Sequence, residues 1–254
     1  MRRWGTGVLL LVACVVESAP LRTPQSPALL VPQSADALSI DGQADESAWA
    51  AADWIAMNAP IIGELPAHGD FSGRYKLLWR DDALYLLAEI VDDQLSDARP
   101  DPVVEYWDDD ALEVFIDSDG TAGPHRDDYR AFAYHIALDG QAVDISPDGP
   151  AVFPEHIQVQ TYRQTHAPFA LSWEVRIRIA VASGDGLTLS GFRPLQRGDE
   201  LRFMLAYCDA DDNTGRQHFV GDIAIPPRNG DRNLGYIDSR VFGHLRLVGS
   251  TQPN

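Results

Sequence analysis

Cysteine is scarce in this chain of 254 residues, where the only two are Cys14 and Cys208. So few thiols exclude the disulfide framework of small secreted proteins and a zinc site built from cysteines. Positive charge is also in short supply, because 38 Asp and Glu residues stand against 20 Lys and Arg, a formal net charge of −18. Such a surface repels nucleic acids and anionic lipid headgroups, so we expect neither as a ligand.

Motifs for several enzyme classes are missing as well. The chain has no Gly-x-Ser-x-Gly nucleophile elbow and no His-Glu-x-x-His zinc motif. Glycoside hydrolysis needs only two carboxyl groups that face each other across a cleft. Acidic residues are plentiful, and abundance alone decides nothing, so an enzyme that hydrolyses O-glycosyl bonds stays open as an alternative. The acids in question include Glu105, Glu113, Glu174 and Glu200.

The N-terminus has the pattern of an export signal. Two arginines precede an uncharged apolar run over residues 5–13, which is too short to span a bilayer. The run ends in Leu11-Val12-Ala13-Cys14, which resembles the lipobox of bacterial lipoproteins. We therefore predict a signal peptide over residues 1–13 and a lipid on Cys14, with plain secretion as the alternative. Val15 is not the Asp that favours inner-membrane retention, so we expect an outer-membrane anchor, in the periplasm or at the cell surface.

Residues 14–35 contain four prolines among Ser, Gln and Thr. This composition is typical of an extended tether, which at ~3.1 Å per residue holds a domain roughly 60 Å from the lipid. The working domain is predicted over residues 36–250.

The body of the chain has the patterns of β-strands. Apolar and charged residues alternate most clearly over 173–179, as expected for a strand with one face in a core. The run 84–91 is almost entirely apolar, which indicates a strand buried on both faces, and Asp139-Gly140 is typical of a hairpin turn. Only residues 45–54 favour a helix, of about two turns. We predict an all-β sandwich with one short helix near the N-terminus of the domain.

Several segments together resemble family 9 carbohydrate-binding modules. The likeness covers roughly residues 36–248, and it is carried by Leu38-Ser39-Ile40-Asp41-Gly42, by Leu78-Trp79-Arg80-Asp81-Asp82, and above all by Trp107-Asp108-Asp109-Asp110-Ala111-Leu112-Glu113. The resemblance implies a β-sandwich related to the DOMON group, a sugar bound at one end between two aromatic rings, and structural calcium. It also implies a module that often accompanies glycoside hydrolases.

A sugar ring exposes an apolar C–H face and a rim of hydroxyls, so its site needs an exposed aromatic ring and polar groups beside it. Trp107 is the best ring, because it stands in an acidic run where a core Trp is not expected. Glu113 is the best polar partner, because it alternates with Leu112 and Val114. Six residues of straight strand span about 20 Å, so the chain must bend at the three consecutive Asp residues for one sugar to touch both. The alternative is that Trp107 plugs the sandwich end and Glu113 pairs with an Arg.

The second ring is expected between Asp209 and Phe219, a region with no Trp. Phe219 or His218 would substitute, although Phe219 also fits a core strand. Asn213 is the amide candidate of the same region. Arg130 is a candidate hydroxyl donor beside the Glu113 strand, with a surface salt bridge as its alternative.

Two oxygen-rich segments are candidates for calcium. One holds Asp209, Asp211 and Asn213 at alternating positions, although the EF-hand pattern fails because no Glu closes the loop. The other holds Asp117 and Asp119 in a Gly-containing turn. Both are also compatible with plain solvated turns.

Taken together, the sequence predicts an exported lipoprotein that binds a mono- or oligosaccharide without catalysis, in carbohydrate catabolism or alongside a glycoside hydrolase. Because the DOMON group includes haem domains, a haem-binding electron-transfer domain is the second alternative. No Cys-x-x-Cys-His motif is present, so haem ligation would have to be non-covalent, through Met57 or Met204 with a His or the single lysine, Lys76.

Overall fold

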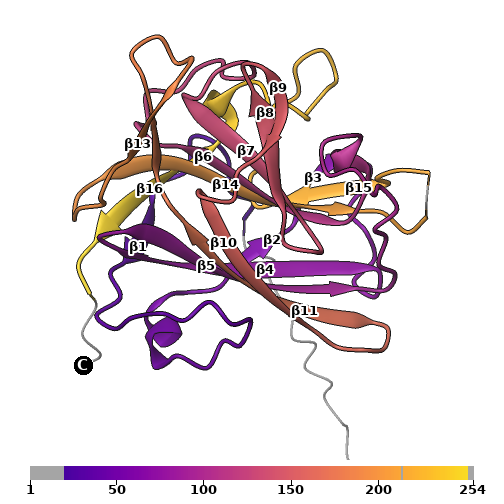
Figure 1. Cartoon of the computed structure of the whole chain (residues 1–254). Coiled ribbons are helices and arrows are strands. Elements are labelled where there is room, and N and C mark those ends of the chain that lie inside the picture. The colour runs from indigo at the N-terminus through magenta and orange to yellow at the C-terminus, as the bar shows by residue number, and fades with distance from the viewer. Residues whose placement is uncertain (1–19, 213, 251–254) are drawn as a thin grey trace, which may run out of the picture.

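The computed structural model describes residues 20–212 and 214–250, and this part of the chain is built from strands joined by turns and three short 3₁₀ helices (Figure 1). The elements in chain order are β1 (Leu29–Pro32), η1 (Ser47–Ala51), β2 (Ile55–Met57), β3 (Ala59–Ile62), β4 (Phe71–Arg80), β5 (Ala83–Asp92), η2 (Tyr106–Asp108), β6 (Ala111–Asp117), β7 (Ala131–Ala137), β8 (Ala142–Ser146), β9 (Gly149–Val152), β10 (Ile157–Arg163), β11 (Phe169–Ile177), β12 (Ala180–Ala182), β13 (Leu189–Phe192), β14 (Glu200–Asp209), β15 (His218–Gly221), η3 (Ser239–Val241) and β16 (Gly243–Val248).

Two sheets form the sandwich. The larger has nine strands, in the order β1-β16-β14-β6-β7-β8-β9, with β15 paired to β14 and β3 paired to β15. The smaller has five, in the order β10-β11-β5-β4-β2, and a separate hairpin joins β12 to β13. The predicted all-β sandwich is therefore confirmed.

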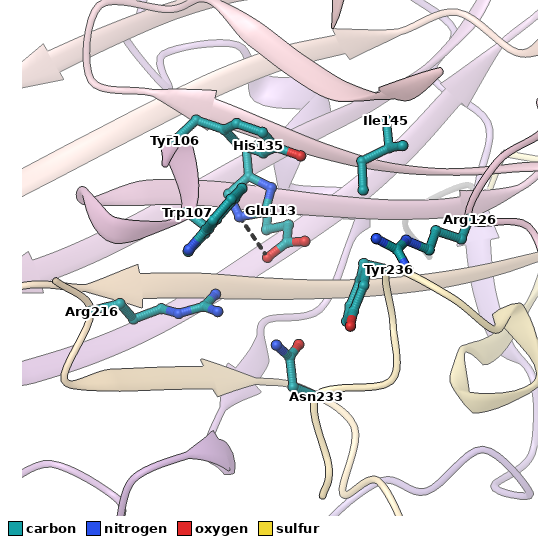
Figure 2. Close-up of a pocket in the computed structure, with 9 residues that line it drawn as sticks. All are labelled: Tyr106, Trp107, Glu113, Arg126, His135, Ile145, Arg216, Asn233 and Tyr236. Atoms are coloured by element: carbon teal, nitrogen blue, oxygen red, sulfur yellow. Dashed lines mark ion pairs between the residues drawn. The ribbon is translucent and has the colours of Figure 1, made fainter. Parts of the chain in front are cut away.

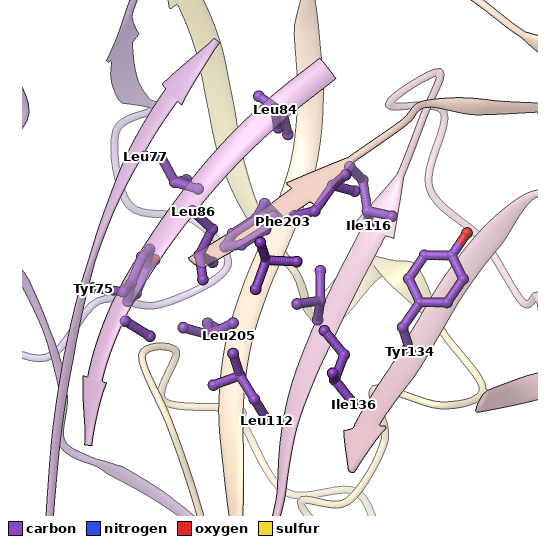
Figure 3. Close-up of a cluster of buried hydrophobic side chains, with 14 of the residues drawn as sticks. Tyr75, Leu77, Leu84, Leu86, Leu112, Ile116, Tyr134, Ile136, Phe203 and Leu205 are labelled. Carbon is purple, nitrogen blue, oxygen red and sulfur yellow. The ribbon is translucent and has the colours of Figure 1, made fainter. Parts of the chain in front are cut away.

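The main core lies between the sheets (Figure 3). Leu112, Val114 and Ile116 of β6 project into it, as their alternation predicts, and so do Leu84 and Leu86 of β5. Strand β5 is also covered on its other face, by the cluster around Trp49, which confirms the prediction of a strand buried on both sides.

The large sheet has a second buried face. Phe115 packs there against the chain that returns over it, including Phe219 and Phe242. The residues that alternate with the main core, among them Glu113, are therefore buried and not solvated. This burial decides the chemistry of the site described below.

The predicted short helix is present but shorter than expected: within 45–54 only the five-residue 3₁₀ turn η1 forms, because Trp49 alone of its residues is buried and no side chain caps its start. The prediction of a free tether is wrong. The described part of the expected tether, residues 20–35, lies on the sandwich. There β1 pairs in parallel with β16, and Arg22 forms an ion pair with buried Asp222.

Among the described residues, no helix is long and apolar enough to cross a membrane. The predicted signal peptide and Cys14 lie outside the described residues.

Candidate functional site

A pocket of about 320 Å³ opens on the face of the large sheet that points away from the second sheet, and not between the two sheets (Figure 2). Its floor comes from β6, β7 and β8, and its walls come from η2 and three loops. The residues that line it are Tyr106, Trp107, Glu113, Arg126, His135, Ile145, Arg216, Asn233 and Tyr236. The pocket thus brings together three aromatic rings, two guanidinium groups and one carboxyl group.

The run of acids next to Trp107 makes the bend that the sequence requires. The Asp109 carboxylate accepts backbone N–H groups of Ala98 and Arg99 at 2.9 and 2.8 Å. The Asp110 carboxylate accepts those of Ser96 and Ala210 at 2.7 and 2.8 Å. These bonds fix the chain between η2 and β6, so Trp107 and Glu113 line the same pocket despite their separation in sequence, and the predicted bend is confirmed.

Trp107 remains accessible, with 40% of its surface exposed. The neighbouring Tyr106 supports it edge-on, with ring centroids 5.1 Å apart, and Tyr106 in turn stands edge-on to His135 at 4.9 Å. The indole is therefore supported at its side by the Tyr106 ring while part of its surface stays accessible.

The floor of the pocket is buried and polar. Glu113 and His135 face each other across paired strands, with Oε2 and Nε2 3.2 Å apart. Burial, helped by the charge of Arg216, lowers the pKa of His135 to about 3. Burial also raises the pKa of Glu113 well above its usual value. Both shifts favour the neutral forms of the two side chains.

Arg216 completes one side of the floor. Its Nη1 donates to the Cys208 Sγ at 3.2 Å, and its guanidinium lies 4.4 Å from the Phe219 ring centroid. Burial raises the pKa of the Cys208 thiol to about 12, which favours its protonated form at neutral pH.

Asn233 and Tyr236 form the wall opposite Trp107 (Figure 2). Their loop is anchored at Gly235, whose carbonyl oxygen accepts the buried His125 Nε2–H at 2.9 Å. Gly235 lies so close to the core that an added Cβ would come within 2.5 Å of the Phe115 Cε1. The tight contact leaves no room for a side chain at position 235 and keeps the loop that carries Asn233 and Tyr236 close to the core.

The other sugar-binding candidates lie elsewhere. Phe219 is buried at 1% exposure and packs on Phe115, so it presents no face to a ligand, and the prediction that it serves as the second ring is wrong. His218 bonds the Glu64 carbonyl at 3.0 Å, and Arg130 pairs with Asp128, so neither lines the pocket. Asn213 lies outside the described residues.

The two calcium candidates differ in how their oxygens are satisfied. Asp117 accepts N–H groups of Gly120 and Ala122 and the Ser239 hydroxyl, and Asp119 accepts the Thr121 N–H, as ordinary turn residues do. By contrast, neither carboxylate oxygen of buried Asp209 has a hydrogen-bond partner. The segment with Asp117 and Asp119 is therefore an ordinary turn, whereas Asp209 is a candidate cation ligand.

Asp209 belongs to an acidic cluster that the sequence only half reveals. Ligand atoms of Asp70, Asp209 and His218 lie within 4.8 Å of one another, and so do those of Asp70, Asp93 and Asp211. One oxygen each of Asp93 and Asp211 also lacks a partner. Burial, with repulsion from Asp211 and Asp70, raises the pKa of Asp209 to about 7. Asp70 and Asp93 were missed because they stand at the ends of the β4–β5 hairpin, far from 209 in sequence.

Comparison with known proteins yields a family and a set of similar folds. The family model described as carbohydrate family 9 binding domain-like matches residues 40–250. A family 9 carbohydrate-binding module from Caldicellulosiruptor kristjanssonii in complex with cellotriose is similar at a TM-score of 0.63 and 19% identity, over 89% of this chain and 96% of that one. The same organism's module in complex with glucose gives 0.62 and 19%, over 89% and 99%.

A putative carbohydrate-binding protein from Bacteroides uniformis ATCC 8492 is similar at a TM-score of 0.54 and 13% identity, over 87% of this chain and 98% of that one. No curated protein matches the sequence.

Proposed function

Because the chain belongs to the carbohydrate family 9 binding domain-like family, we propose that its pocket holds a sugar ring between Trp107 and Tyr236. The observation that carries the proposal is a 40% exposed indole beside a buried carboxyl group in one pocket of about 320 Å³. Aromatic rings on opposite walls match the two C–H faces of a pyranose. The similar modules that bind cellotriose and glucose support this ligand class.

The polar lining matches the hydroxyl rim. Glu113 accepts or donates a hydrogen bond from the floor, Arg216 offers several N–H donors, and Asn233 offers both a donor and an acceptor. A buried polar group that bonds a hydroxyl discriminates strongly between sugars, because a ligand without that hydroxyl leaves it unpaired.

We infer that the protein binds without catalysis. Glycoside hydrolysis uses two carboxyl groups that flank the bond. Within the described part of the chain, Glu113 is the only carboxyl residue that lines the pocket. For the haem alternative, Met57 and Met204 are both buried in hydrophobic clusters and neither lines the pocket, so no observation favours it.

A glycan array tests the proposal. We expect the folded protein to bind a defined set of glycans saturably and to release no product from them. Turnover of a bound oligosaccharide would replace the binding function by an enzymatic one. Absence of binding to every glycan, with native circular dichroism, would remove the function altogether.

Two substitutions at Glu113 test the floor. Gln keeps the shape and hydrogen-bonding capacity of a neutral carboxyl group, so we expect Glu113→Gln to stay folded and to retain affinity within about threefold. Glu113→Ala removes the ligand contact and leaves His135 without its 3.2 Å partner. The lost hydrogen bond is worth about 1–1.5 kcal/mol, or about tenfold in affinity. Titration calorimetry checks whether Glu113→Gln binds sugar more tightly than Glu113→Ala. Equal affinities for the two variants would contradict the prediction.

We propose further that calcium binds the acidic cluster of Asp70, Asp93, Asp209 and Asp211. The residues fit a hard cation, since all four offer carboxylate oxygens and those of buried Asp209 lack any other partner. A divalent ion would offset the repulsion that raises the pKa of Asp209. Its place beside the β4–β5 hairpin gives it a structural role.

Removal of calcium is expected to destabilise the fold. A ligand present at 100 times its Kd adds about 2.7 kcal/mol, so EDTA should lower the Tm and added calcium should restore it. Asp209→Asn should abolish this response, and Asp119→Asn, in the hydrogen-bonded turn, should preserve it. Differential scanning fluorimetry measures both, and a Tm insensitive to EDTA in the wild-type protein would refute the site.

The cellular setting is likewise a proposal. The lipobox-like Leu11-Val12-Ala13-Cys14 supports export and lipid attachment, with the domain held at the outer membrane, where it would serve a glycoside hydrolase. Metabolic labelling with a fatty-acid analogue tests this. Label on the wild-type protein that disappears in Cys14→Ser is expected, and an unlabelled, freely secreted wild-type protein would contradict it.

A further inference from the structure

One positive charge at the mouth of the pocket, that of Arg126, has no carboxylate partner among the described residues. Arg126 is exposed and lines both the pocket and an adjoining hollow of about 530 Å³. Among the described residues, no carboxylate oxygen lies within 4.0 Å of its guanidinium nitrogens. The nearest ring is Tyr236, whose centroid is 6.0 Å from the Arg126 Cζ. The charge therefore lies beside the proposed sugar ring and is not neutralised by the protein.

Arginines in the adjoining hollow behave differently. Arg130 is paired with Asp128, while Arg228 and Arg240 share Asp238 at 2.5 and 2.6 Å. Arg246 and several other described arginines also make no ion pair, so what distinguishes Arg126 is its exposed position at the mouth of the pocket. Its position at the pocket indicates that the ligand supplies the missing acceptor.

The pocket itself does not supply one. Its only carboxyl group within the described chain is Glu113, and burial favours the neutral form of that group by raising its pKa. Arg126 and Arg216 thus place two guanidinium groups beside a single buried carboxyl group in the lining of the pocket.

We infer that the sugar bound here carries a carboxylate, as a uronic acid does, and that this carboxylate pairs with Arg126. The inference rests on the proposed function and names its ligand class. A guanidinium matches a carboxylate through two parallel hydrogen bonds, whereas a neutral sugar gives Arg126 only hydroxyls. A uronic acid keeps the ring faces that would stack on Trp107 and Tyr236. One ligand thus supplies both the stacking faces and the carboxylate for Arg126.

Matched pairs of glycans test the inference: glucose with glucuronic acid, galactose with galacturonic acid, and oligosaccharides that differ in the same way, measured by array and calorimetry. We expect the wild-type protein to prefer the acidic member of its best pair about tenfold. The preference should shrink as NaCl rises from 0.05 to 0.5 M. Arg126→Gln should reduce the ratio of acidic to neutral affinity to about one, and Arg126→Lys should keep part of it.

Arg246→Gln is the matched control, because Arg246 is also exposed but lies on β16 and lines neither hollow. It should leave the ratio unchanged. Equal affinity within every pair, or a preference that survives Arg126→Gln, overturns the uronate inference while the binding function stands. Failure to bind any glycan, neutral or acidic, overturns the function and this inference with it.

Discussion

Trp107→Ala should abolish detectable sugar binding while the protein stays folded. The indole is 40% exposed in the pocket, so the variant removes one of the two aromatic faces that we propose hold the sugar ring. Truncation of a central aromatic contact costs about 2–4 kcal/mol. That corresponds to a fall in affinity of roughly thirtyfold to a thousandfold, which takes a weak sugar interaction below the range of calorimetry.

Two comparisons separate this effect from damage to the fold. Trp107→Phe keeps a smaller ring and should retain part of the affinity. Tyr162→Ala removes another exposed ring, 59% accessible on β10 of the smaller sheet, and should change nothing. The unfolding free energy of Trp107→Ala should stay within about 1 kcal/mol of wild type, because the side chain is largely outside the core. Binding unaffected by the loss of Trp107 would remove the site from this pocket.

The sequence predicts one wall of this site and misses the other, for a physical reason. Trp107 and Glu113 are readable because one is an aromatic in an acidic run and the other alternates with core residues. Asn233 and Tyr236 reach the pocket through a loop that folds back over the sheet, and strand periodicity carries no information on such a return. The one available signal was an aromatic residue in a polar, Gly- and Asn-containing stretch, 229–236, which is typical of an exposed loop.

The alternation pattern also does not predict that the residues in the floor of the pocket are buried. Alternation places Glu113 opposite Leu112 and Val114, and the simplest interpretation of that is solvent. The structure instead covers both faces of the large sheet, so Glu113 is only 2% exposed and contacts His135. Local sequence pattern likewise could not predict that residues 20–35 pack on the sandwich. Prolines indicate extended chain in residues 20–35, but they do not reveal that Asp222, buried in the sandwich, pairs with Arg22.

Gly235→Ala should weaken both the fold and sugar binding, although the added group is one methyl and touches no ligand. A Cβ at this position would lie 2.5 Å from the Phe115 Cε1 and 3.0 Å from the Met204 Cε, and both neighbours are buried. Because Phe115 is packed between other rings, the loop must move outward instead. We expect a loss of about 1–3 kcal/mol in stability, seen as a fall of several degrees in the Tm.

The displaced loop carries Asn233 and Tyr236, so affinity should fall about tenfold even at temperatures where the variant is fully folded. Gly184→Ala is the matched control, because its added Cβ meets nothing within 4 Å and its backbone is not left-handed. Thermal unfolding and calorimetry on both variants give the answer. If Gly235→Ala lost stability but bound sugar normally, Tyr236 would not be the second ring, and the ligand would rest on Trp107 alone.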